Sequence, residues 1–195
     1  RAGAKPLPDG GRVPLRLVVF YGSIIAVTAV YVQYNSTVAL GVSELHGPSA
    51  YAFLLTLNGA LVILCEMPLS GFTRRLPWWI PASAGSALMT VGIVVSGAAR
   101  PYPLIAAGVV LWTVGEMLFS PVVSSATATL APPDRIGRYQ GYLSTVQAVA
   151  FGLGPAAGTF LYGVDTTLLW LCCTAVGALA CLGFLSAGRL ARRTA

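Results

Sequence analysis

Apolar residues in this chain fall into six long runs that are separated by short polar or proline-containing segments. The runs cover approximately residues 14–35, 49–70, 78–98, 103–124, 140–163 and 167–187. Each run is close to the roughly 20 apolar residues that a helix needs to cross a hydrocarbon core about 30 Å thick. The pattern therefore predicts six transmembrane helices with short connections, apart from a loop around residues 35–48.

The same pattern predicts one transmembrane domain with polar ends. We expect a cytoplasmic linker at 1–13, a six-helix domain at 14–187 and a cytoplasmic tail at 188–195. The first apolar run is long, has no clear cleavage site and is followed by five more, which is not typical of a secretory signal. The chain begins at Arg1 rather than Met. This favours a fragment of a longer protein, with a half-size protein that dimerises as the alternative.

Composition and charge placement support a membrane protein and give its orientation. Hydrophobic residues make up 56% of the chain and charged residues 9%, against roughly a quarter charged in soluble domains. Of the 12 Lys and Arg residues, Arg100 alone falls outside one set of helix ends, so the positive-inside rule predicts that both termini are cytoplasmic. The net charge of +6 is dispersed along these ends, which argues against a nucleic-acid partner. The residues of this set are Arg1, Lys5, Arg12, Arg16, Arg74, Arg75, Arg135, Arg138, Arg189, Arg192 and Arg193.

Neither a metal site nor a catalytic site is expected. Cys65, Cys172, Cys173 and Cys181 all fall within predicted helices, and the adjacent pair points to different helix faces. His46 is the single histidine and falls in the predicted loop, so no cluster of metal ligands forms. The sequence contains no hydrolytic motif or phosphate-binding loop. We therefore predict a protein without cofactors that is not an enzyme.

Polar and aromatic residues form one face on the first predicted helix and another on the fourth. Spacings of three, four and seven residues place such side chains along a single helix face. Both faces are predicted to line a substrate cavity, although a belt of polar and aromatic residues at the membrane interface is the alternative for Tyr34 and Asn35. The predicted cavity residues are Tyr21, Thr28, Tyr31, Trp112, Thr113 and Glu116.

Two acidic residues fall within apolar runs. A carboxylate inside the bilayer is costly, so Glu116 in the fourth run predicts a site that binds a proton or attracts a cationic substrate. A structural ion pair is the alternative for Glu116 and the favoured interpretation for Glu66, which is within reach of the loop that carries Arg74 and Arg75. Asn58 is predicted to serve as an interhelical clamp or a cavity hydrogen-bonder.

The fifth run predicts a helix with one face suited to close packing. Spacings of four and three residues place polar side chains at its cytoplasmic end and small residues further along the same face. A proline between the two glycines weakens the local backbone hydrogen bonding and is typical of a bend. The predicted interface residues are Gln140, Ser144, Gln147, Gly154, Pro155 and Gly158.

These motifs resemble the second half of a major facilitator superfamily transporter, particularly its drug-exporter-like branches. Residues 154–158, GPAAG, are similar to the core of the antiporter glycine-proline motif, although that motif is diagnostic in the first half. The loop at 71–75 keeps Gly71, Arg74 and Arg75, but Thr73 stands where the family has an acid. The most characteristic stretch comprises Gly115, Glu116, Pro121, Ala131, Pro132, Arg135, Gly137, Arg138, Tyr139 and Gly141.

The resemblance implies an architecture and a function. The chain would form two three-helix inverted repeats and pair with an N-terminal six-helix half, or with a second copy if it is half-size. Its first and fourth helices would line the cavity, its second and fifth would meet the other half, and its third and sixth would lie outside. The implied activity is proton-coupled efflux of a drug-like compound across the cytoplasmic membrane, although the sequence does not fix the direction of transport. The rival interpretation is a six-helix membrane scaffold or assembly subunit.

Overall fold

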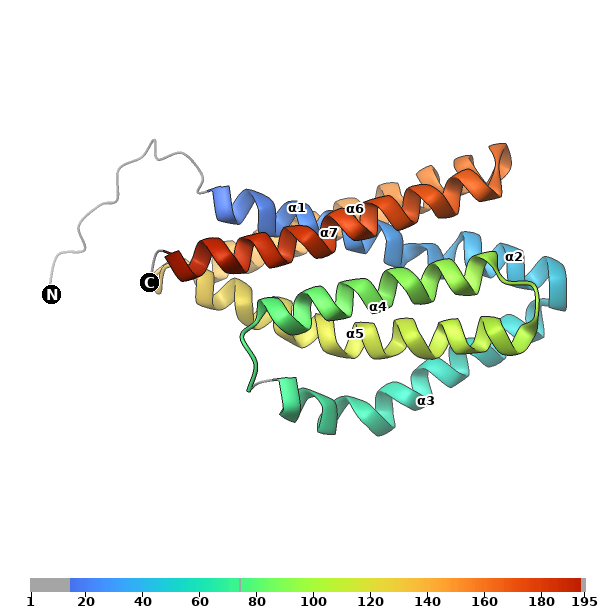
Figure 1. Ribbon diagram of the computed structural model, residues 1–195, viewed down its shortest axis with the longest axis horizontal. Helices are drawn as coiled ribbons and strands as arrows, with labels where there is room; N and C mark the ends of the chain where they lie inside the picture. The colour runs from blue at the N-terminus through green and yellow to red at the C-terminus, as the bar shows by residue number, and fades with distance from the viewer. Residues whose placement is uncertain (1–14, 74, 194–195) are drawn as a thin grey trace, which may run out of the picture.

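The computed structural model describes residues 15–73 and 75–193, and the regular structure of these residues is helical (Figure 1). The predicted linker at 1–13 and Arg74 lie outside the described residues. The helical structure of the described residues confirms the all-α class. In chain order the elements are α1 Leu15–Tyr31, the 3₁₀ helix η1 Val32–Asn35, α2 Thr37–His46, α3 Pro48–Thr73, α4 Trp79–Ala98, α5 Tyr102–Leu130, α6 Ile136–Val164 and α7 Thr166–Arg193.

Five helical segments are long and apolar enough to cross a membrane. They are the continuous segment Leu15–His46, which joins α1, η1 and α2, together with α3, α4, α5 and α7. Five of the six predicted spans are thus confirmed by length and composition. The other is α6, which has 29 residues but is interrupted by polar side chains along one face and is not among these five. Its crossing of the membrane stays a prediction.

The predicted loop around residues 35–48 is wrong, because most of this segment is the helix α2. The chain forms the 3₁₀ helix η1 and then continues as the α-helix α2. This helix ends before Gly47, which has a φ of 87°. Ser36 and Thr37 each donate a hydrogen bond of 3.1 Å to the side-chain oxygen of Gln33, which stabilises the junction. The polar residues at 35–37 suggest a turn, but the side chains of Ser36 and Thr37 bond to the preceding helical residues.

Glycines bring α4 and α5 into close contact. Gly85 and Gly92 on α4 face Gly115 and Gly108 on α5, and a Cβ atom on Gly92 would lie 2.4 Å from the backbone nitrogen of Trp112. Only glycine permits this approach. Within this chain α4 packs mainly against α5 and α7, and many of its residues are buried. The outer position that the resemblance implies for it relative to the other half stays a prediction.

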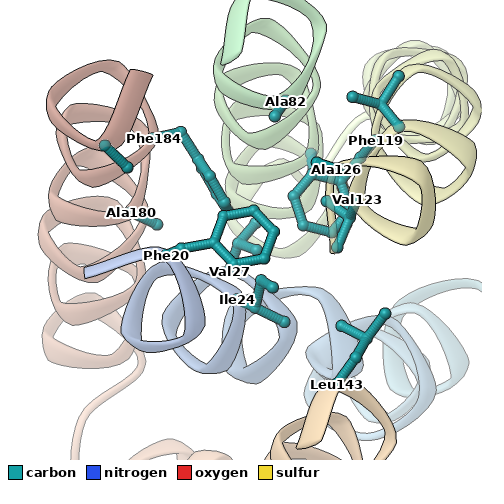
Figure 2. Packing of buried hydrophobic residues seen from close by; sticks show 13 residues of the cluster. Phe20, Ile24, Val27, Ala82, Phe119, Val123, Ala126, Leu143, Ala180 and Phe184 are labelled. Carbon is teal, nitrogen blue, oxygen red and sulfur yellow. The ribbon is translucent and has the colours of Figure 1, made fainter. Parts of the chain in front are cut away.

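The main apolar core lies where α1, α4, α5 and α7 meet. Figure 2 shows the ring of Phe20 from α1 projecting into this region, toward Phe184 of α7. The ring of Phe184 makes edge contacts with Phe20 at 6.1 Å and with Phe119 at 5.6 Å between centroids. These contacts place α1 against both α7 and α4, which also pack on each other.

In contrast, α3 lies along one edge of the bundle and is almost wholly exposed (Figure 1). It contacts α5 and α2, whereas the side chains of Ile63 and Met67 are 82% and 87% exposed. The large apolar side chains Leu153 and Phe160 of α6 are also exposed. These two helices therefore present apolar faces that nothing in the described chain covers.

Candidate functional site

The partly buried carboxyl group of Glu116 lies where side chains of three helices meet. Tyr31 on α1 donates a hydrogen bond of 2.8 Å to Oε1 of Glu116 on α5. Asn58 on α3 donates one of 3.4 Å to Oε2 and another of 3.0 Å to the hydroxyl oxygen of Thr113. Thr113 in turn donates to the backbone carbonyl of Val109, one turn earlier on α5. Side chains far apart in the sequence thus hold one carboxyl group.

Aromatic rings form a wall beside this carboxyl group. The rings of Tyr31 and Tyr34 lie 4.9 Å apart between centroids, and Trp112 lies 5.9 Å from Tyr31 and 5.4 Å from Tyr34. Tyr51 on α3 fixes the base of the wall by donating a hydrogen bond of 2.6 Å to the backbone carbonyl of Tyr34. Trp112 is 2% exposed, and its Nε1 has no hydrogen-bond partner among the described residues.

The partners of Glu116 are uncharged. Within residues 15–73 and 75–193, the ion pair present joins Asp134 to Arg135 at 3.5 Å, far along the chain from this site. A carboxylate here is stabilised by neutral donors only, and a bound proton or an external cation would supply the missing positive charge. The arrangement is chemically suited to reversible protonation or to binding a cation next to aromatic faces.

The structure brings together four of the six predicted cavity residues by direct contact or as neighbours on one turn: Tyr31, Trp112, Thr113 and Glu116. Tyr21 is elsewhere, since its hydroxyl donates a hydrogen bond of 3.0 Å to the backbone carbonyl of Tyr139 at the start of α6. Ten residues separate Tyr21 from Tyr31, which is about 15 Å along a helix. Thr28 is buried on α1 with 4% exposure.

The predicted cationic partners of Glu66 are not in contact with it in the described part of the chain. Glu66 and Arg75 are both exposed, and neither forms an ion pair with a described residue. Arg74 lies outside the described residues. The ion-pair interpretation of this acid therefore stays a prediction.

The predicted packing face of α6 divides into two parts. At one end Gln140 donates a hydrogen bond of 2.9 Å to the backbone carbonyl of Ser124 on α5, and Ser144 donates one to the carbonyl of Gln140. Further along, Gly154 and Gly158 lie against α1 and η1. The remaining predicted interface residues are Gln147, which is partly buried, and Pro155, which lies within α6.

Gln33 is a structurally central residue that sequence reasoning missed. Its amide nitrogen donates hydrogen bonds of 3.0 Å to the carbonyls of Gly154 and Ala29, and its oxygen accepts from Ser36 and Thr37. A Cβ atom on Gly158 would collide with this side chain. Gln33 could have been found from the sequence, because it is an amide side chain within an apolar run. A buried amide in a membrane helix requires hydrogen-bond partners.

Comparison with known proteins finds two transporters to which the chain is similar. No family model matches it. It is 29% identical to the uncharacterized MFS-type transporter YttB of Bacillus subtilis (strain 168) over 170 residues, which are 80% of this chain and 41% of YttB. It is 23% identical over 138 residues to a second uncharacterized MFS-type transporter of that organism, YqjV, covering 69% of this chain and 32% of YqjV. The chain thus matches less than half the length of either relative.

Proposed function

Because this chain is similar to two MFS-type transporters, we propose that it is the C-terminal half of a secondary active transporter. The intact protein would move a small organic solute across the cytoplasmic membrane by alternating access, with both termini in the cytoplasm. The chain's six helices would then form two three-helix inverted repeats, as in many transporter folds. The observation that carries the proposal is the Glu116 carboxyl group on α5, which accepts hydrogen bonds from the neutral side chains of Tyr31 on α1 and Asn58 on α3.

Glu116 is the proton-coupling residue in this proposal. A carboxyl group at this depth can gain and lose a proton with little structural change, because Tyr31 and Asn58 keep it in place in either state. Loss of the proton leaves a charge inside the bilayer, which is costly unless a cation or a water-filled passage reaches it. Opening the site to one side and then the other couples this proton to the conformational change.

The aromatic wall of Tyr31, Tyr34 and Trp112 supports a substrate that is partly apolar. Flat ring faces next to a carboxyl group suit a drug-like compound, and especially one with a positive charge. Asn58, which is partly buried, adds a polar side chain next to the carboxyl group.

The exposed apolar faces of α3 and α6 support an N-terminal six-helix half as the partner. Both relatives are more than twice as long as the part that the chain matches. Large apolar patches on a protein mark a surface in contact with lipid or with another protein. In the proposed transporter, the N-terminal half covers α3 and α6 on the side that completes the cavity, and lipid covers the rest.

The decisive experiment is solute transport by the intact protein in proteoliposomes, measured as a function of pH. Glu116→Gln keeps the size of the side chain and one acceptor oxygen but cannot exchange a proton. Its transport should lose its pH dependence, while Asp134→Asn, which changes an exposed acid, should keep it. Full proton-driven transport by Glu116→Gln would reject the coupling role.

A further inference from the structure

A second polar cavity lies at the opposite end of the bundle from the start of α1 and the end of α7. It has a volume of about 440 Å³ and lies between α2, the end of α4, the end of α6 and the start of α7. Figure 1 shows these segments gathered at one end of the molecule. Its volume is within the usual range for small-molecule sites, and it shares no residue with the cluster around Glu116.

Two opposite charges line this cavity without neutralising each other. Glu44 comes from α2 and Arg100 from the α4–α5 connection. They form no ion pair with each other among the contacts of the described residues. Charged residues are only 9% of the chain, so an acid and a base on one small cavity are a specific feature.

Contacts around the cavity hold both charged residues in place. Tyr162 on α6 donates a hydrogen bond of 3.0 Å to Oε2 of Glu44. His46, two residues later on α2, pairs through Nε2 with the backbone carbonyl of Arg100 at 2.8 Å, and its ring contacts Tyr102. The nearby Asp165 already accepts hydrogen bonds from the backbone at the start of α7, so Glu44 is the acid available to a ligand.

The rest of the lining is suited to an organic molecule. The buried Trp170 packs closely on Gly97 and provides an aromatic surface, and Val94 adds an aliphatic one. Thr166 and Thr167 lie at the exposed rim. A ligand that carries a positive group, a negative group and an apolar part matches this lining.

We propose that this cavity binds a small zwitterion, with its ammonium group at Glu44 and its anionic group at Arg100. Two sources share this chemistry. One is a free amino-acid-like solute, and the other is the ethanolamine phosphodiester headgroup of a phospholipid. The site is separate from the proposed transport pathway, so its test does not depend on Glu116.

The first test compares ligands on the unaltered protein. Purified protein in nanodiscs of phosphatidylglycerol, which has no ammonium group, is titrated calorimetrically with leucine, leucinamide and 4-methylpentanoate. The last two each lack one charge. Because a charge-assisted contact contributes roughly one order of magnitude in affinity, each should bind about ten-fold more weakly than leucine. Equal binding of all three compounds would overturn the proposal.

The lipid source is tested in parallel by native mass spectrometry. Protein prepared in an equal mixture of phosphatidylethanolamine and phosphatidylglycerol should retain the ethanolamine lipid preferentially if the headgroup is the ligand. Leucine binding without lipid preference identifies a free solute, and the reverse identifies the lipid. The proposal is wrong if the protein neither binds leucine nor prefers the ethanolamine lipid.

Variants then assign the binding to these two residues. Glu44→Gln keeps an oxygen acceptor for Tyr162, and Arg100→Gln keeps the backbone carbonyl that pairs with His46, so both should fold. Each should weaken zwitterion binding about ten-fold or abolish the lipid preference. Asp134→Asn and Arg135→Gln make the same charge changes outside the cavity and should leave binding unchanged. Unchanged binding in the two cavity variants would assign it elsewhere and overturn the proposal.

Discussion

The hydroxyl group of Tyr31 lies 2.8 Å from Oε1 of Glu116, although 85 residues separate them in the sequence. This hydrogen bond joins the first membrane-spanning segment to α5 across the interior of the bundle. The ring of Tyr31 also contacts Tyr34 and Trp112. One residue thus links the acid to the aromatic wall, and its two roles can be separated experimentally.

Tyr31→Phe should lower the free energy of unfolding by about 1 kcal/mol, because it removes an interhelical hydrogen bond and keeps the ring. The measurement is thermal unfolding of the purified protein, followed by tryptophan fluorescence. Tyr34→Phe is the matched control, since its ring belongs to the same wall while its hydroxyl makes no hydrogen bond among those of the described residues. Equal destabilisation by both variants would show that the bond to Glu116 contributes little.

Packing between α4 and α5 gives a second prediction. Gly92→Ala should destabilise the protein by about 1–3 kcal/mol, because the new Cβ atom would lie within 2.4–2.7 Å of backbone and side-chain atoms of α5. Gly22→Ala on α1 is the control, because a Cβ atom there meets nothing within 4 Å and alanine favours the helix by up to about 1 kcal/mol. If Gly92→Ala is as stable as Gly22→Ala, the two helices are not closely packed in the membrane.

The sequence predicts the place of five apolar helical segments among the described residues, because length and hydropathy are local properties. It also identifies Glu116, since a lone acid in an apolar run is conspicuous. It does not predict that Tyr31 and Asn58 are the partners of this acid, because those contacts depend on how helices are rotated against one another. Such rotation follows from packing, here from Phe20 and the α4–α5 glycines.

The segment α2 and the residue Gln33 show the same limit at shorter range. Residues 35–37 are polar and predict a turn, whereas the side chains of Ser36 and Thr37 bond to Gln33 and the helix resumes. The carbonyl of Gly154 that completes this network comes from α6, 121 residues away. The secondary-structure propensity of single residues predicts neither the contacts of Gln33 with Ser36 and Thr37 nor its contact with Gly154.

Accessibility to water separates a transporter from a packed scaffold. Thr28 and Thr113 are too buried to report on this, with exposures of 4% and 0%. Ser120 is exposed and lies one turn beyond Glu116 on the same helix face. In a protein without its four native cysteines, Ser120→Cys should react in membranes with a charged thiol reagent, because a transport pathway admits water. Leu179→Cys, on an exposed apolar face of α7, should stay unmodified in lipid.

The contrary result has an equally clear meaning. If Ser120→Cys is protected in native membranes and reacts only after detergent is added, the polar face of α5 is covered by protein or lipid. The scaffold interpretation would then be favoured over transport. Detergent solubilisation provides the positive control, because it should expose both cysteines to the reagent.

The last prediction concerns whether α6 crosses the membrane. Its 29 residues would extend about 43 Å, which exceeds a hydrocarbon core of about 30 Å. Its low hydropathy is compatible with a span because polar residues such as Gln140 bond to α5 rather than facing lipid. We therefore expect six spans, with the exposed residues Asp134 and Val164, which flank α6, on opposite sides.

Single cysteines at these two positions test this directly in sealed, oriented vesicles. A membrane-impermeant thiol reagent added outside should modify one of Asp134→Cys and Val164→Cys, and permeabilisation should allow it to modify both. An odd number of spans would place both cysteines on the same side, so that they react together before permeabilisation. In that case the two ends of the chain would lie on opposite sides of the membrane. The orientation predicted from residues such as Arg16 and Arg189 would then be wrong, and so would the prediction of a six-helix half.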